Sequence, residues 1–178
     1  MARKKLKAKA KATSKNLVAI LMGSASDWDT MAHAKAALDE LGVTSEMRVL
    51  SAHRTPDALQ RYLKSSLRQG TKIFIAAAGM AAHLAGAVAA QTTVPVIGVP
   101  LAGPNLDGLD ALLSTVQMPG GIPVATVAIG KAGAKNAGIL AAQILGVADR
   151  AVAGRVFQQR KKSAREILLK DRQLARKA

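Results

Sequence analysis

Short apolar runs alternate along this chain with longer segments in which apolar residues recur every three or four positions. The runs are bounded by glycine, proline or polar residues, which is typical of buried strands, and the periodic segments are typical of helices that pack on one face. Strands are predicted at 17–22, 43–50, 72–77, 94–99 and 124–129, and helices at 27–41, 56–69, after 86 to about 92, 107–116 and 133–145.

The regular alternation of strands and helices predicts a parallel sheet, because the chain must cross back over the sheet between successive strands. A continuous apolar run such as Leu17–Met22 fits a strand that is covered on both faces. We therefore expect an α/β fold, a three-layer α/β/α sandwich around a flavodoxin- or Rossmann-like sheet of five parallel strands.

The two ends of the chain differ from the middle in charge. Residues 1–16 carry seven Lys or Arg and no acid, residues 150–178 carry ten and two, and 17–149 carries nine of each sign, so the net charge of +15 lies in the ends. We expect a disordered basic arm over 1–16, an α/β catalytic domain over 17–149 and a basic C-terminal helix over 150–178 that reaches away from the core. Nucleic acid is an unlikely partner of the neutral domain, and a solubilising extension is favoured over a nucleic-acid arm.

The amino-acid composition indicates how the core is filled and in which compartment the protein works. Apolar residues make up 49% of the chain but aromatic residues only 2%, so Ala, Val, Ile and Leu must fill the core. There is no cysteine, which fits a reducing compartment. No apolar run approaches the ~18 residues of a membrane span, and the first residues lack the apolar stretch of a secretory signal. These features predict a cytoplasmic protein without a membrane partner.

Three of the predicted strands are followed by loops rich in reactive side chains. These loops are Gly23–Trp28, Ser51–Pro56 and Ala78–Leu84, and in the second of them Thr55 is expected to cap the helix that begins at Pro56. Since parallel strands end at the same edge of a sheet, and ligands bind at that edge, the three loops are expected to meet there. Together they present serine hydroxyls, one carboxylate, one guanidinium and two imidazoles above small residues, namely Ser24, Ser26, Asp27, Ser51, His53, Arg54, Gly79 and His83.

This set of side chains suits a phosphorylated sugar. Arg54 and the serine hydroxyls can bind the phosphate, whereas the carboxylate of Asp27 suits sugar hydroxyls or an amine. His53 is left for proton transfer, because imidazole titrates near neutral pH. No metal-ligand spacing, no Ser-His-Asp pattern and no glycine-rich nucleotide loop is present, so neither a metal nor a cofactor is predicted.

Five motifs in this order resemble the PurE family. They are Gly-Ser-x-Ser-Asp-Trp at 23–28, Ser-Ala-His-Arg-Thr-Pro at 51–56, Ala-Gly-x-Ala-Ala-His-Leu at 78–84, Gln-Met-Pro-x-Gly-x-Pro-Val at 117–124 and Asn-Ala at 136–137. The resemblance is strongest to the class I members, the N5-carboxyaminoimidazole ribonucleotide mutases. Class II members, which carboxylate aminoimidazole ribonucleotide directly, typically have Lys where Arg54 stands and Ser-Asn where Ala82 and His83 stand.

The resemblance implies an isomerisation in purine synthesis. A carboxylate moves from the exocyclic nitrogen of the substrate to ring carbon C4 without ATP, biotin or metal, and carbon dioxide is held in a closed site between the two steps. His53 takes the place of the family's acid/base histidine, and Ser24, Asp27 and Arg54 those of substrate-binding residues. The other four loop residues are neighbours of the substrate. The resemblance also implies a homo-octamer with the C-terminal helix at a subunit interface, and a functional link to the synthetase that makes N5-carboxyaminoimidazole ribonucleotide.

The chain departs from the family at three small-residue positions. Family members usually have Gly where Ala77 and Met80 stand and Pro where Ala85 stands, and Met80 adds bulk beside the expected carbon dioxide pocket. Two other functions stay open at this point. One is direct carboxylation of aminoimidazole ribonucleotide, and the other is a nucleic-acid-associated protein that uses its basic ends.

Overall fold

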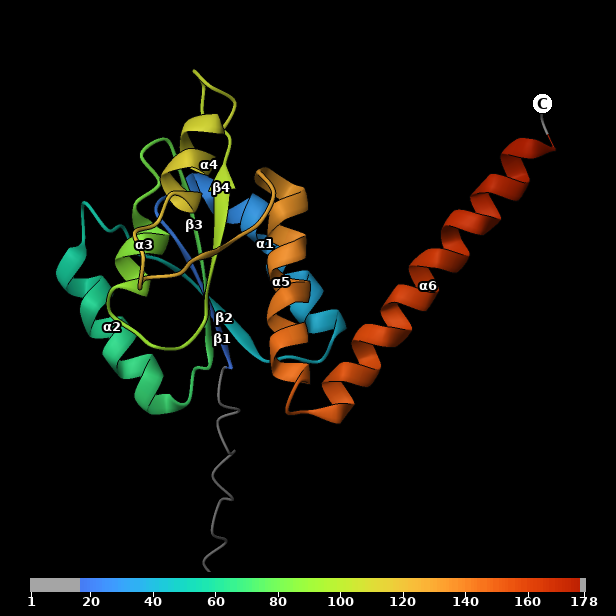
Figure 1. Ribbon diagram of the computed structural model, residues 1–178, viewed down its shortest axis with the longest axis horizontal. Helices are drawn as coiled ribbons and strands as arrows, with labels where there is room; N and C mark the ends of the chain where they lie inside the picture. Colours follow the sequence, from blue (N-terminus) through green and yellow to red (C-terminus); the bar gives the residue numbers. More distant parts are fainter. Residues whose placement is uncertain (1–16, 177–178) are drawn as a thin grey trace, which may run out of the picture.

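Five parallel strands form one sheet at the centre of the molecule, as the sequence predicts (Figure 1). A computed structural model describes residues 17–176. The strands are β1 (Val18–Met22), β2 (Ser45–Val49), β3 (Ile73–Gly79), β4 (Val96–Leu101) and β5 (Ala125–Thr126), and their order in the sheet is β2-β1-β3-β4-β5. The chain adds β2 on one side of β1 and the later strands on the other side, so the strand order switches between β1 and β3. Doubly wound sheets bind ligands at the carboxyl ends of the two strands that flank such a switch.

Each face of the sheet is covered by its own layer of helices. Val18, Ile20 and Met22 point to the face covered by α1 (Trp28–Glu40) and α5 (Gly130–Gly146). Ala19 and Leu21 point to the opposite face, which is covered by α2 (Pro56–Gln69) and α3 (Leu84–Ala89). The predicted three-layer sandwich is therefore confirmed, and the unbroken apolar run of β1 is explained by burial on both faces.

Several element boundaries differ from the prediction. The strand β4 continues through Pro100 to Leu101, because Pro100 still pairs with Ala78 of β3 although it has no N–H to donate. The edge strand β5 keeps two residues of the expected six, since it pairs only with β4. The helix α3 ends at Ala89 rather than near 92, and α5 begins at Gly130 rather than 133.

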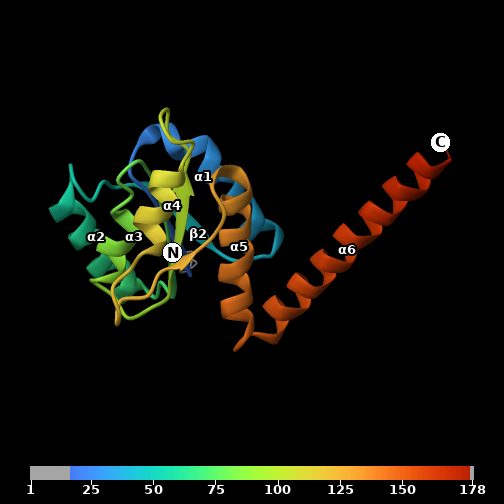
Figure 2. The same cartoon turned by 45° about the horizontal axis from the view of Figure 1, so that its top comes forward.

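The two remaining helices are α4 and α6. The helix α4 (Leu109–Val116) packs over β4, where Thr115 lies above Gly98. The helix α6 (Arg150–Ala175) buries only Val152 and Val156 and then projects away from the sandwich (Figures 1 and 2). The predicted C-terminal helical extension is thus present, whereas the arm expected over 1–16 and the last two residues lie outside the described part of the chain.

Candidate active site

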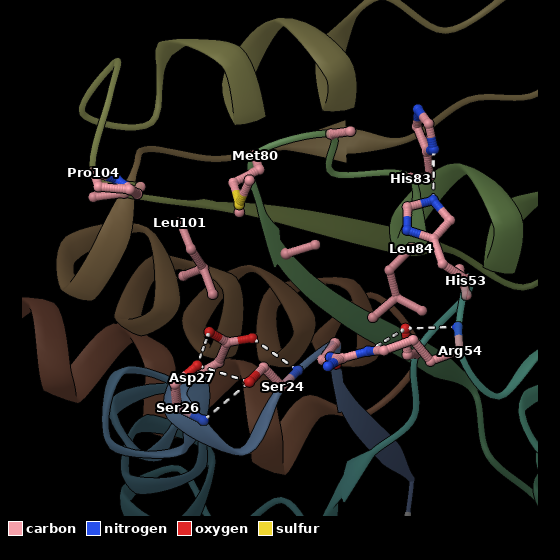
Figure 3. A pocket seen from close by; sticks show the side chains of 18 residues that line it. Ser24, Ser26, Asp27, His53, Arg54, Met80, His83, Leu84, Leu101 and Pro104 are labelled. Carbon is pink, nitrogen blue, oxygen red and sulfur yellow. Dashed lines mark hydrogen bonds between the residues drawn. The ribbon is translucent and has the colours of Figure 1, made fainter.

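A cavity of about 600 Å³ opens at the carboxyl end of the sheet (Figure 3). Its walls come from the segments that follow β1, β2, β3 and β4. All eight site residues predicted from the sequence line it, and they are joined by ten others: Gly23, Ala52, Ala78, Met80, Ala81, Leu84, Leu101, Ala102, Gly103 and Pro104. The convergence of strand ends in a parallel sheet therefore brings the three predicted loops together as expected.

The loop after β1 is held by a reciprocal pair of hydrogen bonds. The backbone N–H of Ser24 donates to Asp27 Oδ2 at 3.1 Å, and the Ser24 hydroxyl accepts the backbone N–H of Ser26 at 3.3 Å. The Ser26 hydroxyl donates to Ser24 Oγ at 2.8 Å. This capping box fixes a single 3₁₀ turn, Ala25–Asp27, at the entrance to α1. The two hydroxyls and the carboxylate are consequently presented together at the wall of the cavity.

The environment of Asp27 makes its carboxyl harder to ionise than a carboxyl in water. Partial burial raises the pKa of Asp27 above its ordinary value, because desolvation disfavours the charged form. Hydrogen bonds from Ser24 and Ser26 and the charge of Arg54 act in the opposite direction but do not outweigh burial. Asp27 is therefore an acceptor that gains from meeting a hydrogen-bond donor of a ligand.

Arg54 links the loop after β2 to the loop after β1. Its Nη2 donates to the carbonyl oxygen of Gly23 at 2.6 Å, and its backbone N–H donates to Ser51 Oγ at 3.1 Å. Arg54 Nε also donates to Ser51 Oγ, at 3.5 Å, so two of the guanidinium N–H groups have partners and the remaining ones can bind an anion. The nearly buried Ser51 thus acts on the site through Arg54.

The expected capping role of Thr55 is wrong. Thr55 stands at the start of α2, but its hydroxyl makes no cap to that helix. It donates to the carbonyl oxygen of Ser51 at 3.1 Å and accepts the Ser51 backbone N–H at 2.9 Å. The side chain therefore closes the turn that carries His53 and Arg54, because a threonine hydroxyl can satisfy a nearby turn as well as a helix end.

His53 and His83 meet across the cavity rim. His53 Nε2 lies 2.8 Å from His83 Nδ1, and the rings are perpendicular, with centroids 4.9 Å apart. At this distance the two nitrogens share one proton, so one of them must be an acceptor. Figure 3 shows the second nitrogen of His53 on the side of the cavity, where it can exchange a proton with a ligand.

The sequence predicts only one side of the apolar part of the cavity. Gly79 forms its floor beside β4, because a Cβ added there would lie 3.3 Å from the carbonyl oxygen of Leu101. Leu101 and the loop that follows it to Pro104 form one wall, and sequence reasoning gave them no role. The available signal was their position, directly after a fourth parallel strand.

Two further properties of residues 17–176 bear on the kind of protein this is. Across residues 17–176, no three His, Asp or Glu side chains gather as a metal site would require. In the same part of the chain, no helix is both long and apolar enough to cross a bilayer. The geometry defines an α/β protein with an open pocket at the carboxyl edge of its sheet. The pocket is lined by hydroxyls, one carboxylate and one guanidinium and is flanked by a histidine pair.

Comparison with known proteins identifies the family. A family model described as "AIR carboxylase" matches residues 17–166, and the chain belongs to this family. The N5-carboxyaminoimidazole ribonucleotide mutase of Bacillus subtilis strain 168 is 54% identical over 158 residues, which cover 89% of this chain and 98% of the relative. The mutase of Mycobacterium tuberculosis H37Rv is 51% identical over 161 residues, covering 90% and 91%.

Solved structures agree with this assignment. The crystal structure of Treponema denticola PurE superimposes with a TM-score of 0.80 at 31% identity and covers 88% of this chain and 97% of its own. A second crystal structure, of a substituted form of Treponema denticola PurE2, gives a TM-score of 0.81 at 30% identity, with coverage of 88% and 96%. The resemblance that the five motifs indicate is therefore confirmed at the level of both sequence and fold.

Proposed function

We propose that this chain is an isomerase of purine biosynthesis that converts N5-carboxyaminoimidazole ribonucleotide into 4-carboxy-5-aminoimidazole ribonucleotide. The observation that carries the proposal is the pocket itself, in which His53 faces the same cavity as Ser24, Asp27 and Arg54. The mutases that are 51–54% identical over most of their length support the choice of reaction.

The reaction is balanced without an oxidant or a cofactor. The bond between the carbamate carbon and the exocyclic nitrogen breaks, carbon dioxide leaves, and the nitrogen takes up a proton. Ring carbon C4 then attacks the retained carbon dioxide, a carbon–carbon bond forms, and C4 loses its proton. His53 is the acid that supplies the first proton and the base that accepts the second, which an imidazole can do near neutral pH.

The remaining polar residues bind the substrate. Arg54 and the hydroxyls of Ser24 and Ser26 hold the phosphate, because a guanidinium and hydroxyls are good partners for a phosphate dianion. Asp27 accepts from the ribose hydroxyls, which replaces the water that its partial burial removes. Ser51 orients Arg54, as the 3.1 Å hydrogen bond to the Arg54 backbone supports.

Gly79 and His83, the remaining two of the eight site residues, border the region proposed to bind the ring. Gly79 leaves room for the ring and for carbon dioxide next to the backbone of β4. His83 orients His53 through the 2.8 Å contact between their ring nitrogens. Neither residue is needed to hold a metal, and the proposed chemistry uses none.

The proposal extends to the setting of the enzyme. We infer a homo-octamer in the cytoplasm, with α6 at a subunit interface and a functional link to the synthetase that makes N5-carboxyaminoimidazole ribonucleotide. The exposed apolar residues in the outer half of α6 support an interface there.

Substitution of His53 tests the function directly. Purified wild-type protein is expected to convert N5-carboxyaminoimidazole ribonucleotide into the C4-carboxylated isomer without ATP, and His53→Asn is expected to lose at least about 100-fold in kcat, since general acid–base catalysis contributes roughly 10²–10⁴-fold. The product is measured by chromatography against both isomers.

A second histidine provides the matched control. His33 is exposed on α1 and does not line the cavity, so His33→Asn is expected to keep wild-type activity. Turnover of aminoimidazole ribonucleotide with bicarbonate, with the N-carboxylated compound ignored, would assign direct carboxylation instead. No turnover of either compound by a correctly folded protein would refute the proposal.

A further inference from the structure

Four cationic side chains lie in one line along the C-terminal helix. They are Lys161, Arg165 and Arg172 of α6 and Arg176 directly after it, so they are separated by four, seven and four positions. At 3.6 residues per turn, these positions fall within roughly 60° of the helix circumference and span about 22 Å of its length. We call this line of side chains the basic stripe.

Acidic side chains lie away from the basic stripe. No stripe residue has an Asp or Glu three or four positions away, whereas Glu166 stands four positions from both Lys162 and Lys170. The ion pairs of residues 17–176 include no stripe residue, and it is Lys162 that reaches Glu40, at 4.0 Å. The charge of the stripe is therefore not neutralised within the described part of the chain.

The basic stripe is open to solvent. The outer half of α6 is exposed on every side, and Figures 1 and 2 show it standing clear of the sandwich. At the inner end of the stripe, Lys161 and Arg165 line a hollow of about 680 Å³ between α6 and the end of α1. Two acids, Glu40 and Glu166, also line this hollow, beside Lys162. A large anionic partner can reach the stripe along its whole length.

The stripe is separate from the features that the proposed isomerisation uses. None of its residues lines the cavity at the carboxyl edge of the sheet. The match with the family model ends at residue 166, so Arg172 and Arg176 are not among the features that define the family. The exposed Ile167 and Leu174 point to the opposite side of the helix, so a subunit contact through them leaves the stripe accessible.

We propose that the basic stripe binds the phosphate backbone of double-stranded DNA, as an activity independent of the isomerase site. Four cations in a line match a row of regularly spaced phosphates. Three of the four are arginines, and a guanidinium can bind a phosphate with two N–H groups at once. Contacts of this kind fix the protein on the backbone and do not read the bases, so binding is independent of base sequence.

Duplex DNA fits this helix better than other nucleic acids do. A helix is about 10–12 Å across and the major groove of B-form DNA is about 12 Å wide, so the helix can approach the phosphates at the edge of the groove. The major groove of double-stranded RNA is deep and narrow. Single strands are bound by stacking bases on aromatic side chains, and α6 has one aromatic residue, Phe157, which lies before the stripe.

The experiment measures binding of the full-length protein to a fluorescent DNA duplex by anisotropy at a series of salt concentrations. Wild-type protein is expected to bind, and its affinity is expected to fall steeply between about 50 and 200 mM salt. The stripe variant carries Lys161→Gln, Arg165→Gln and Arg172→Gln. It is expected to bind at least about tenfold more weakly and to flatten the slope of log K against log salt by about three, since each phosphate contact contributes roughly −0.9.

Two matched variants control for net charge. The first removes three cations of α6 that lie off the stripe, by Arg160→Gln, Lys162→Gln and Lys170→Gln. The second removes three cations of the basic N-terminal segment, by Arg3→Gln, Lys4→Gln and Lys5→Gln. Each is expected to lose less than about threefold in affinity, because one uncontacted charge adds little at these salt concentrations. Isomerase activity is expected to be unchanged in the stripe variant, and circular dichroism checks that α6 is kept.

Four outcomes would overturn the inference. The first is no salt-dependent binding of DNA by the wild type. The second is a loss of affinity in either control variant equal to that in the stripe variant, which would assign binding to net charge or to the N-terminal segment. The third is tighter binding to duplex RNA, polyglutamate or anionic lipid vesicles than to DNA, which would make that partner the one the stripe fits. The fourth is loss of isomerase activity in the stripe variant, which would assign the stripe to the enzyme itself.

Discussion

Asp27 shows how a single side chain can serve both the local fold and the pocket at a cost in stability. A carboxyl whose pKa is raised binds its proton more tightly in the folded chain than in the unfolded chain. The folded state therefore loses stability as the pH rises from the ordinary Asp range through the raised value. The amide of Asp27→Asn cannot ionise, and it can keep the hydrogen bonds to Ser24 and Ser26.

We expect the stability difference between Asp27→Asn and wild type to shift in favour of the variant as the pH rises from below 3.8, the ordinary value, to neutrality. Urea unfolding at a series of pH values measures this difference. Asp57→Asn, at the exposed start of α2, controls for the loss of one negative charge. A difference for Asp27→Asn that stays constant with pH would contradict the prediction, and a raised KM for the same variant is expected from its proposed contact with ribose.

Small residues allow the helix α5 to pack closely against α1. Gly138 of α5 lies so close to α1 that an added Cβ would be 2.6 Å from the carbonyl oxygen of Ala34 and 3.0 Å from Ala37 Cβ. Gly138→Ala must therefore push the two helices apart, and overpacking of this kind costs roughly 1–3 kcal/mol. We expect a fall in the free energy of unfolding of that size, measured by denaturant unfolding.

Gly154 of α6 is the matched comparison for Gly138. An added Cβ at Gly154 meets no atom within 4 Å. Gly154→Ala only replaces a flexible residue inside a helix, which stabilises a helix by roughly 0.5–1 kcal/mol. Equal effects of the two substitutions would show that close approach of α5 to α1 is not what Gly138 provides.

Association of the subunits is expected to depend on α6. Beyond its first two turns this helix is largely exposed, and the apolar side chains of Ile167, Leu168 and Leu174 face outward without cover from the described residues. We expect Ile167→Glu combined with Leu168→Glu to reduce the mass of the proposed octamer, because burial of apolar area drives subunit association. Light scattering measures the mass.

A charge-matched variant makes this test specific. Lys170→Glu on the same helix changes the net charge by as much as the double substitution and removes no apolar side chain, so it is expected to keep the octameric mass. An unchanged mass of the double variant would show that the outer half of α6 lies outside the interface. A change for Lys170→Glu alone would point to charge rather than apolar burial.

The amino-acid sequence alone predicts the alternation of strands and helices, the parallel sheet and the three loops at its carboxyl edge. These features depend on local rules, namely periodic burial and the turn residues around His53, and the resemblance of the motifs to one family added the expected reaction. Gly42 and Gly70 end α1 and α2 for the same local reason, since both adopt the left-handed conformation that glycine permits.

The way in which the loops meet depends on the packing of the whole fold. The 2.8 Å contact of His53 with His83 joins residues thirty positions apart, and the wall from Leu101 to Pro104 belongs to a fourth strand end that carries no reactive side chain. The left-handed backbone of Met80 is equally invisible to a periodic pattern. A pattern reports which face of an element is buried, whereas the shape of a pocket depends on distances between elements, and the packing of all layers sets those distances.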